Sequence, residues 1–180
     1  MKQVVVESLD VPGSIRSSSG LYVNIDNIDP DSINIEDIAH ASASQPRFGG
    51  HLPFSPEGYV YSVAQHCINC FMMAPPEFEL EALMHDASEA YLCDIPSPFK
   101  ARMADYANLE SRLMRVIADK FKFKYPMPPE IKKIDRLVLE REWNVIMLNK
   151  PGIQYDPIRI MSAPEAKARF LEIFEQIDRR

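Results

Sequence analysis

Four residues of the chain have the side-chain types that bind a divalent metal ion. They are His66, the adjacent residues His85 and Asp86, and the distant Asp135. Imidazoles together with carboxylates suit a borderline transition metal such as Zn, Mn, Fe or Co. The first hypothesis is therefore a metal site with nitrogen and oxygen ligands, assembled from three separate segments.

The segment EALMHDASEAYL places this chemistry on an otherwise apolar helix. His85 and Glu89 are four residues apart, and Asp86 and Glu89 are three apart, so the three side chains can share one helical surface. An isolated carboxylate is costly to bury and needs a partner. Two carboxylates beside an imidazole satisfy each other poorly, but they suit a cation. Their apolar neighbours are Leu83, Met84, Ala87, Ala90 and Tyr91.

Each residue also has an ordinary structural interpretation. His66 could be a hydrogen-bonded core histidine, and Asp135 could be a surface or capping acid. Against this, both fall where a helical bundle prefers apolar residues. The spacing alone leaves the two interpretations evenly balanced.

The elements that must position these residues are predicted to be helices. The chain is expected to form one domain over residues 1–180, all-α, with a helical core at 31–180 and a small β or irregular annex at 1–30. Residues 2–6 and 21–25 are β-rich and could form a hairpin, with 11–20 as loop. Residues 45–58, rich in Pro and Gly, are predicted to be a loop. Helices are predicted in segments 33–43, 61–74, 77–92, 102–121, 128–148 and 163–178.

The amino-acid composition limits the kinds of molecule that the protein is expected to bind. A net charge of −6 and a pI of about 5.3 argue against broad binding to nucleic acid, but allow a small phosphorylated substrate. No apolar run reaches the length of a membrane span, and the N-terminus lacks a cleavage pattern, so a cytoplasmic protein is expected. Cys67, Cys70 and Cys93 are expected to be reduced core residues, because a structural zinc site would draw four ligands, mostly from turns.

Three stretches of the sequence resemble the HD-domain phosphohydrolase superfamily. They are YSVAQHC, ALMHDASEAYLCDIPSPFK and KKIDRLVLEREW, and the resemblance extends over roughly residues 20–150. The superfamily pattern is a His, a later His-Asp dipeptide and a still later Asp. The resemblance implies that His66, His85, Asp86 and Asp135 ligate the metal.

Within that superfamily, HDASE followed by DIPSPFK is similar to bacterial 5′-deoxynucleotidases of the YfbR type and to phage dATP triphosphohydrolases of the DatZ type. The likeness implies that Glu89 is tied to the catalytic water and that Asp94 belongs to the sugar and catalytic site. It also implies that Arg47 and Phe48 touch the nucleotide, although Trp is usual where Phe48 stands and the loop is spaced differently.

Two further residues are candidate substrate contacts. Lys100 could stabilise charge on a phosphoryl group, or it could be a solvated lysine at a helix start. His51 could donate to a phosphate, or it could cap its loop.

The function expected from the resemblance is a metal-dependent deoxynucleotide phosphohydrolase. The RFGGH context favours a phage-type triphosphohydrolase that releases deoxynucleoside and triphosphate, with dATP as substrate. The cofactor is expected to be Zn, Co or Mn, and the sequence leaves open whether one ion binds or a second divalent ion joins it with the substrate. The alternatives are a 5′-deoxynucleotidase acting on dNMPs, a nucleotide-binding sensor without turnover, and a helical interaction module with a structural metal. A homo-oligomer is expected by analogy.

Overall fold

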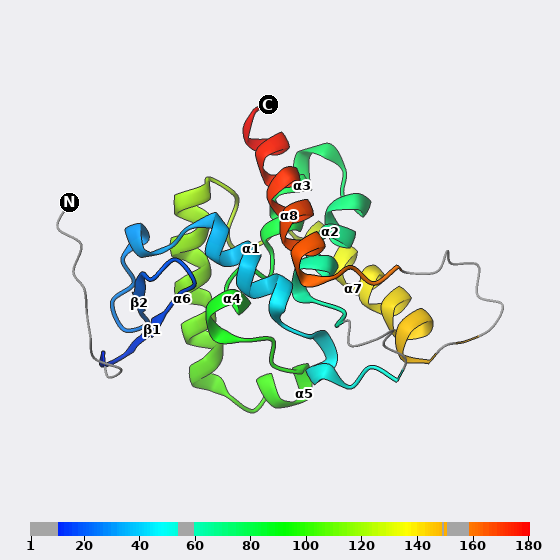
Figure 1. Cartoon of the computed structure of the whole chain (residues 1–180), viewed down its shortest axis with the longest axis horizontal. Helices are drawn as coiled ribbons and strands as arrows, with labels where there is room; N and C mark the ends of the chain where they lie inside the picture. The colour runs from blue at the N-terminus through cyan, green and yellow to red at the C-terminus, as the bar shows by residue number, and fades with distance from the viewer. Residues whose placement is uncertain (1–10, 54–59, 149, 151–158) are drawn as a thin grey trace.

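Helices form most of the structure, a computed structural model that describes residues 11–53, 60–148, 150 and 159–180 (Figure 1). The all-α prediction with a small β annex is confirmed for these residues. In chain order the elements are β1 (Ser14–Arg16), β2 (Tyr22–Asn24), η1 (Pro30–Ser32), α1 (Ile35–Ser44), η2 (Arg47–Gly50), α2 (Val63–Met73), η4 (Pro76–Phe78), α3 (Glu79–Met84), α4 (Glu89–Leu92), α5 (Ser97–Lys100), α6 (Ala104–Phe121), α7 (Pro129–Glu142), η5 (Trp143–Met147) and α8 (Ala163–Asp178).

The annex is a two-stranded antiparallel hairpin, in which Ile15 lies opposite Val23. The second strand falls within the predicted 21–25 segment. Its partner β1 lies in the stretch predicted to be loop, so that prediction was wrong. Gly20, with positive φ, lies in the turn between the strands, where its N–H donates to the Ser17 carbonyl and the chain reverses so that β1 pairs with β2. The predicted strand at 2–6 lies outside the described residues.

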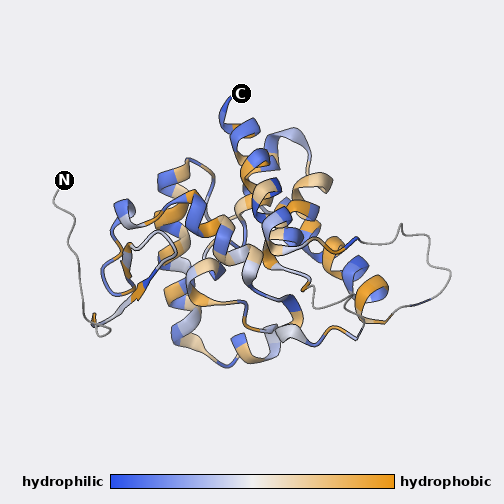
Figure 2. Ribbon diagram, viewed as in Figure 1, coloured by the Kyte–Doolittle hydropathy of each residue, from blue (hydrophilic) through white to orange (hydrophobic). Residues whose placement is uncertain are grey.

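The core lies where α1, α2, α3 and α8 pack together, with α8 alongside α1 (Figure 1). Helix α1 begins after Asn34, one of the two predicted caps, whose side chain accepts a hydrogen bond from the Asp37 backbone. Helix α8 begins with a capping box between Ser162 and Glu165. The helices carry both hydrophobic and hydrophilic residues, as expected when one face of each is buried (Figure 2).

The predicted helix at 77–92 is interrupted at the residues of greatest chemical interest. The chain forms α3 up to Met84, a turn over residues 85–88, and then the short α4. The Glu89 backbone N–H donates to the Asp86 carbonyl three residues back, a tighter winding than that of an α-helix. The turn re-aims His85 and Asp86 relative to a continuous helix.

The predicted helix at 128–148 also changes form near its end. The α-helical part, α7, begins at Pro129 and ends at Glu142, and a π-helical turn, η5, continues to Met147. Proline suits a helix start, where its missing N–H has no partner to lose. None of the helices within the described residues is long and apolar enough to cross a membrane.

Candidate metal centre

Four side-chain atoms converge from α2, α7 and the 85–88 turn. His66 Nε2 lies 3.2 Å from His85 Nε2, 3.1 Å from Asp135 Oδ1 and 3.8 Å from Asp86 Oδ2. His85 Nε2 lies 3.3 Å from Asp86 Oδ2 and 4.0 Å from Asp135 Oδ1. Ligand atoms of a tetrahedral ion with bonds of about 2.1 Å are separated by about 3.4 Å. Three of the predicted ligands, His66, His85 and Asp135, form with Cys70 a group that could hold one metal ion, and Asp86 lies beside it, near both imidazole nitrogens.

The two imidazoles are oriented so that their lone pairs meet. His66 Nδ1 lies 2.7 Å from the Glu142 carboxylate, and His85 Nδ1 lies 2.8 Å from the Ala82 carbonyl oxygen. Both acceptors require the proton of a neutral ring to be on Nδ1. Each Nε2 then presents a lone pair to the other and to two carboxylates. Such a set of acceptors is repulsive unless a cation lies between them, and this is the observation that fits a metal ion.

The electrostatics of the cluster also favour positive charge. Burial lowers the pKa of His85, but the charge and hydrogen bond of Asp86 together with the charges of Cys70 and Cys67 outweigh that effect, so the net pKa is well above the ordinary value. The pKa of Asp135 is lowered despite burial, through the hydrogen bond with His66 and the charge of His85. The cluster thus binds protons tightly, and a divalent ion would supply the same charge with both rings neutral.

Glu142 is a supporting residue that the sequence reasoning missed. It is completely buried, and it accepts a hydrogen bond of 2.6 Å from Tyr61 Oη while it holds His66. A carboxylate on the distal nitrogen of a ligating histidine fixes the ring and raises its basicity. The available signal was its position, seven residues after Asp135 and four after the buried Val138, on the same face of α7.

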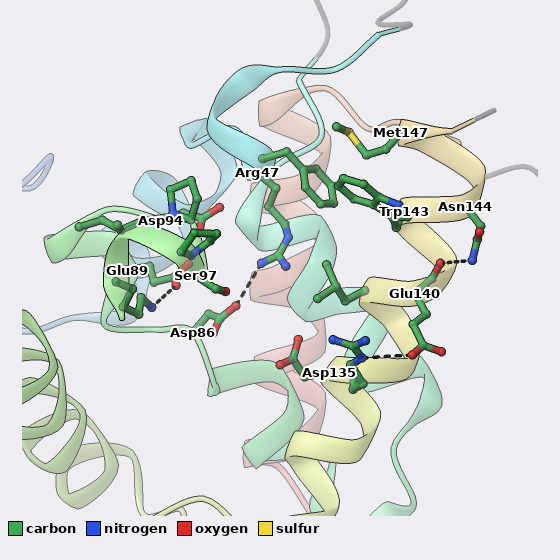
Figure 3. Close-up of a pocket in the computed structure, with 17 residues that line it drawn as sticks. Arg47, Asp86, Glu89, Asp94, Ser97, Asp135, Glu140, Trp143, Asn144 and Met147 are labelled. Carbon is green, nitrogen blue, oxygen red and sulfur yellow. Dashed lines mark hydrogen bonds and ion pairs between the residues drawn. The ribbon is translucent and has the colours of Figure 1, made fainter. Parts of the chain in front are cut away.

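The centre lies at one end of an open cavity of about 640 Å³, within the usual range for small-molecule sites. Figure 3 shows Asp86 and Asp135 pointing toward each other, with Arg47 directed at Asp86 from the opposite side. Glu89, Asp94 and Lys100 also line the cavity, so the predicted catalytic pair and most predicted substrate contacts share one space with the ligands.

Comparison with known proteins gives a family without a functional name. The chain is 41% identical over 128 residues to the uncharacterized protein YfdR of Escherichia coli K12, covering 71% of this chain and 69% of that protein. The chain belongs to the YfdR family. It is also 34% identical over 126 residues to the uncharacterized protein RCAP_rcc00048 of Rhodobacter capsulatus, covering 66% of this chain and 63% of that protein. No family model matches the chain.

In this member of the YfdR family, Glu89 and Asp94 are held together by Gln45. The Gln45 amide donates to the Glu89 carbonyl oxygen at 2.9 Å and accepts from the Asp94 backbone N–H at 3.1 Å. Burial, with the charges of Asp86 and Asp94, raises the pKa of Glu89 to about 8. Glu89 Oε2 is buried without a hydrogen-bond partner among the described residues. Glu89 is therefore positioned to hold or take up a proton.

Arg47 is attached to the centre through its backbone and its side chain. Its N–H donates to the Tyr61 carbonyl, just before α2, and its guanidinium lies 3.3 Å from Asp86 Oδ2 and 3.6 Å from Glu142 Oε2. Lys100 is likewise paired, 3.3 Å from Glu89 and 2.8 Å from Glu110. The idea that Lys100 is simply solvated does not fit this double pairing.

The structure bears on two further side chains: it favours one of the two alternatives given for His51, and it contradicts the prediction that Cys93 lies in the core. His51 is exposed and is not among the cavity lining, and its backbone N–H donates to Phe48, which fits the capping alternative. Cys93 is exposed, whereas Cys67 and Cys70 are buried as expected. Cys70 Sγ also lies 3.6 Å from His66 Nε2, within reach of the metal centre, because the turn of α2 places it beside its i−4 neighbour.

Proposed function

We propose that this protein is an HD-type, metal-dependent phosphohydrolase that acts on a small deoxynucleotide. The observation that carries the proposal is the set of four converging acceptors, His66, His85, Asp86 and Asp135, at the end of a cavity that also contains an unpartnered buried carboxylate. Neither the converging acceptors nor the unpartnered carboxylate would be expected in a helical bundle with a purely structural role.

The donor set fits Zn, Co or Mn, which accept mixed imidazole and carboxylate ligation. Such an ion polarises a phosphoryl oxygen and lowers the pKa of water toward neutrality. Asp86 and Asp135 both line the cavity, so the proposed centre is accessible to substrate.

Glu89 is the proposed general base. Lys100 Nζ lies 3.3 Å from Glu89 Oε1, which leaves Oε2 as the free acceptor. A carboxylate whose pKa burial has raised toward 8 takes a proton from water more readily than an ordinary glutamate does. As the water oxygen bonds to phosphorus, its proton passes to Glu89.

Asp94 is the proposed proton donor to the leaving group, and Arg47 is the proposed contact of the phosphoryl oxygens. When the bond between phosphorus and the 5′ oxygen breaks, that oxygen needs a proton. Burial raises the pKa of Asp94, so its carboxyl group can hold one there. Arg47, now paired with Asp86, can turn part of its guanidinium toward the phosphoryl oxygens.

The charges of the residues that line the cavity bear on how many phosphate groups the substrate carries. With every group ionised, the five acids and three bases that line the cavity carry a formal net charge of −2, and each of the three bases already has a carboxylate partner. One divalent ion neutralises that charge, which suits a monophosphate. A triphosphate, favoured by the sequence resemblance, would need a second divalent ion near Glu89 and Asp94. The bases are Arg47, Lys100 and Arg136, and the acids are Asp86, Glu89, Asp94, Asp135 and Glu140.

The test measures metal content and product release together. The protein is loaded in turn with Zn²⁺, Co²⁺ and Mn²⁺ and given a panel of dNMPs and dNTPs, including dATP. Inorganic phosphate and tripolyphosphate are quantified separately. Tripolyphosphate release with two ions per chain indicates the triphosphohydrolase, and phosphate release with one ion indicates the 5′-deoxynucleotidase.

Two variants isolate the proposed base. Glu89→Gln should remove turnover and retain metal, whereas the exposed Glu77→Gln should retain both. Loss of metal in Glu89→Gln would make Glu89 a ligand instead of a base. Metal-loaded wild-type protein that binds nucleotides without releasing either product would be a sensor, and one that binds none would be a helical module with a structural metal.

A further inference from the structure

An aromatic pair lies in the cavity away from the metal centre. The rings of Phe48 and Trp143 have centroids 6.1 Å apart and planes tilted by 58°. Both residues line the cavity, and Figure 3 shows Trp143 and Met147 at the end opposite Asp135. An aromatic residue at helical spacing usually packs in a core, but 47% of the surface of Trp143 is exposed. The pair therefore offers apolar ring faces to the contents of the cavity.

The backbone is irregular at both members of this pair. Phe48 has a φ of 57° and a ψ of 27°, in the left-handed region that is strained for a residue with a bulky side chain. Trp143 begins the π-helical turn, and such turns frequently occur at functional sites. Two unrelated departures from regular geometry thus meet at one pair of rings. Strain that persists at a cavity points to a role in binding.

Helix α7 and its π-helical extension connect the metal centre to the aromatic pair. Asp135, Leu139, Trp143 and Met147 recur at four-residue intervals, and all four line the cavity. Eight residues of helix separate Asp135 from Trp143 along this wall, a rise of roughly 12 Å. The wall changes from charged to apolar along that distance, as an extended ligand with one charged and one apolar end would require.

Arg47 and Phe48 connect the same two ends from the opposite side. Arg47 reaches Asp86 and Glu142 at the metal centre, while Phe48, the next residue, faces Trp143. The guanidinium carbon of Arg47 lies 5.8 Å from the Phe48 ring centroid. The two walls together define a slot with a phosphate-binding end and a planar, aromatic end.

We infer that Phe48 and Trp143 form the binding site for the nucleobase, with the base stacked against Trp143 and bounded by Phe48. The inference rests on the proposed function, because it takes the ligand of the metal end to be a nucleotide. Every base has a π-face, so stacking here provides affinity for a nucleotide over a sugar phosphate. Met147 and Leu139 complete the apolar surroundings of the ring.

Trp143 is the only tryptophan in the chain, so its fluorescence reports directly on this site. The Zn²⁺-loaded Glu89→Gln protein is titrated with dAMP, dATP and 2-deoxyribose 5-phosphate, with excitation at the red edge of the tryptophan band. Saturable quenching by dAMP or dATP, and none by the sugar phosphate, is the expected result. Equal quenching by the sugar phosphate, or no quenching by either nucleotide, would overturn the assignment.

Kinetics of variants give a second, independent readout. Phe48→Ala and Trp143→Ala should raise KM for the nucleotide substrate by about 5- to 150-fold, the range found when one base–aromatic stack is removed. Hydrolysis of 2-deoxyribose 5-phosphate should not change. Leu137→Ala is the matched control, since Leu137 is 53% exposed on α7 and does not line the cavity.

The outcomes separate this inference from the proposed function. If nucleotides quench the fluorescence but the wild-type protein turns over no substrate, the base-binding site is supported and the proposed hydrolase activity is contradicted. If the wild-type protein hydrolyses nucleotides and KM is unchanged in both aromatic variants, the hydrolase activity is supported and the base-binding site is contradicted.

Discussion

Two acidic sites of this protein, the buried Asp37 and the partly exposed pair Asp86 and Asp135, differ in the groups that surround their carboxylates. At Asp37, on α1, both oxygens accept hydrogen bonds from neutral donors of the chain. Oδ1 accepts from Ser18 Oγ at 2.5 Å and the Ser19 N–H at 2.8 Å, and Oδ2 accepts from Ser19 Oγ and Asn34 Nδ2, each at 2.7 Å. At the metal centre, two carboxylates face two imidazole nitrogens whose protons lie on the far side of each ring.

The difference separates a structural acid from a ligand-binding one. Asp37 is only 3% exposed, yet its charge is fully solvated by the protein, so nothing further is needed. Asp86 and Asp135 have too few donors for their oxygens and face other acceptors instead. The number of hydrogen-bond donors around each carboxylate therefore distinguishes the two sites.

The largest expected effect comes from removing a ligand. Asp135→Ala should reduce bound metal to near zero and lower turnover by at least about 1000-fold, because the ion's contribution to a phosphoryl transition state is several kcal/mol. The metal-free protein should lose some stability at neutral pH, since protonated His66 loses the carboxylate that lies 3.1 Å from its Nε2. Metal analysis, product release and thermal unfolding of the chelated protein measure these three quantities.

Asp119→Ala is the matched control for that experiment, because Asp119 is exposed on α6, away from the cavity. It should leave metal content and turnover unchanged. An Asp135→Ala protein that retains stoichiometric metal would show that the four acceptors do not act as a ligand set.

The opposite pattern is expected at the structural cluster. Asp37→Ala should lower the free energy of unfolding by about 2–4 kcal/mol, because the donors of Ser18, Ser19 and Asn34 lose their common acceptor. Metal content should stay at the wild-type value. Denaturant unfolding measures the loss, and a change below about 1 kcal/mol would mean that those donors find other partners.

A smaller effect is expected from the residue behind His66. Glu142→Gln should weaken metal affinity by about 10- to 100-fold without abolishing binding, because an amide can still accept from Nδ1 but lacks the charge. Competition with a chelator of known affinity measures the change. Glu130→Gln, in the first turn of α7, is the control, and equal affinity in the two variants would reduce Glu142 to a packing role.

Much of the fold was predictable from hydrophobic periodicity. The bounds of α8 and the N-cap of α1 agree with the sequence because capping residues and apolar spacing act locally. The breaks at residues 85–88 and 143–147 were not predictable, since both are set by tertiary contacts of side chains that a single-helix pattern cannot reveal. Short strand β1 was missed because it contains only one apolar residue, Ile15.

Some residues of the candidate site were likewise predictable from the sequence, and others were not. His66, His85, Asp86 and Asp135 could be found because polar residues stand out on apolar helix faces. Trp143 could not be assigned correctly, since an aromatic residue at helical spacing usually packs in a core. Its direction depends on the π-helical turn.

The pH dependence of stability offers the last distinction between the two clusters. Serine donors lower the pKa of Asp37, against the effect of burial, from 3.8 to about 2. A carboxyl group with a depressed pKa stabilises the fold above its unfolded pKa, so about 2 kcal/mol should be present above pH 4 and lost as the pH falls toward 2. The wild-type protein and Asp37→Asn are unfolded in denaturant across this range, both free of metal. Their difference in unfolding free energy cancels the titration of Asp86 and Asp135 and should shrink steadily below pH 4. A difference that stays constant with pH would mean that Asp37 has the same pKa in the folded and unfolded chains. The charge of Asp37 would then not contribute to the stability of the folded protein.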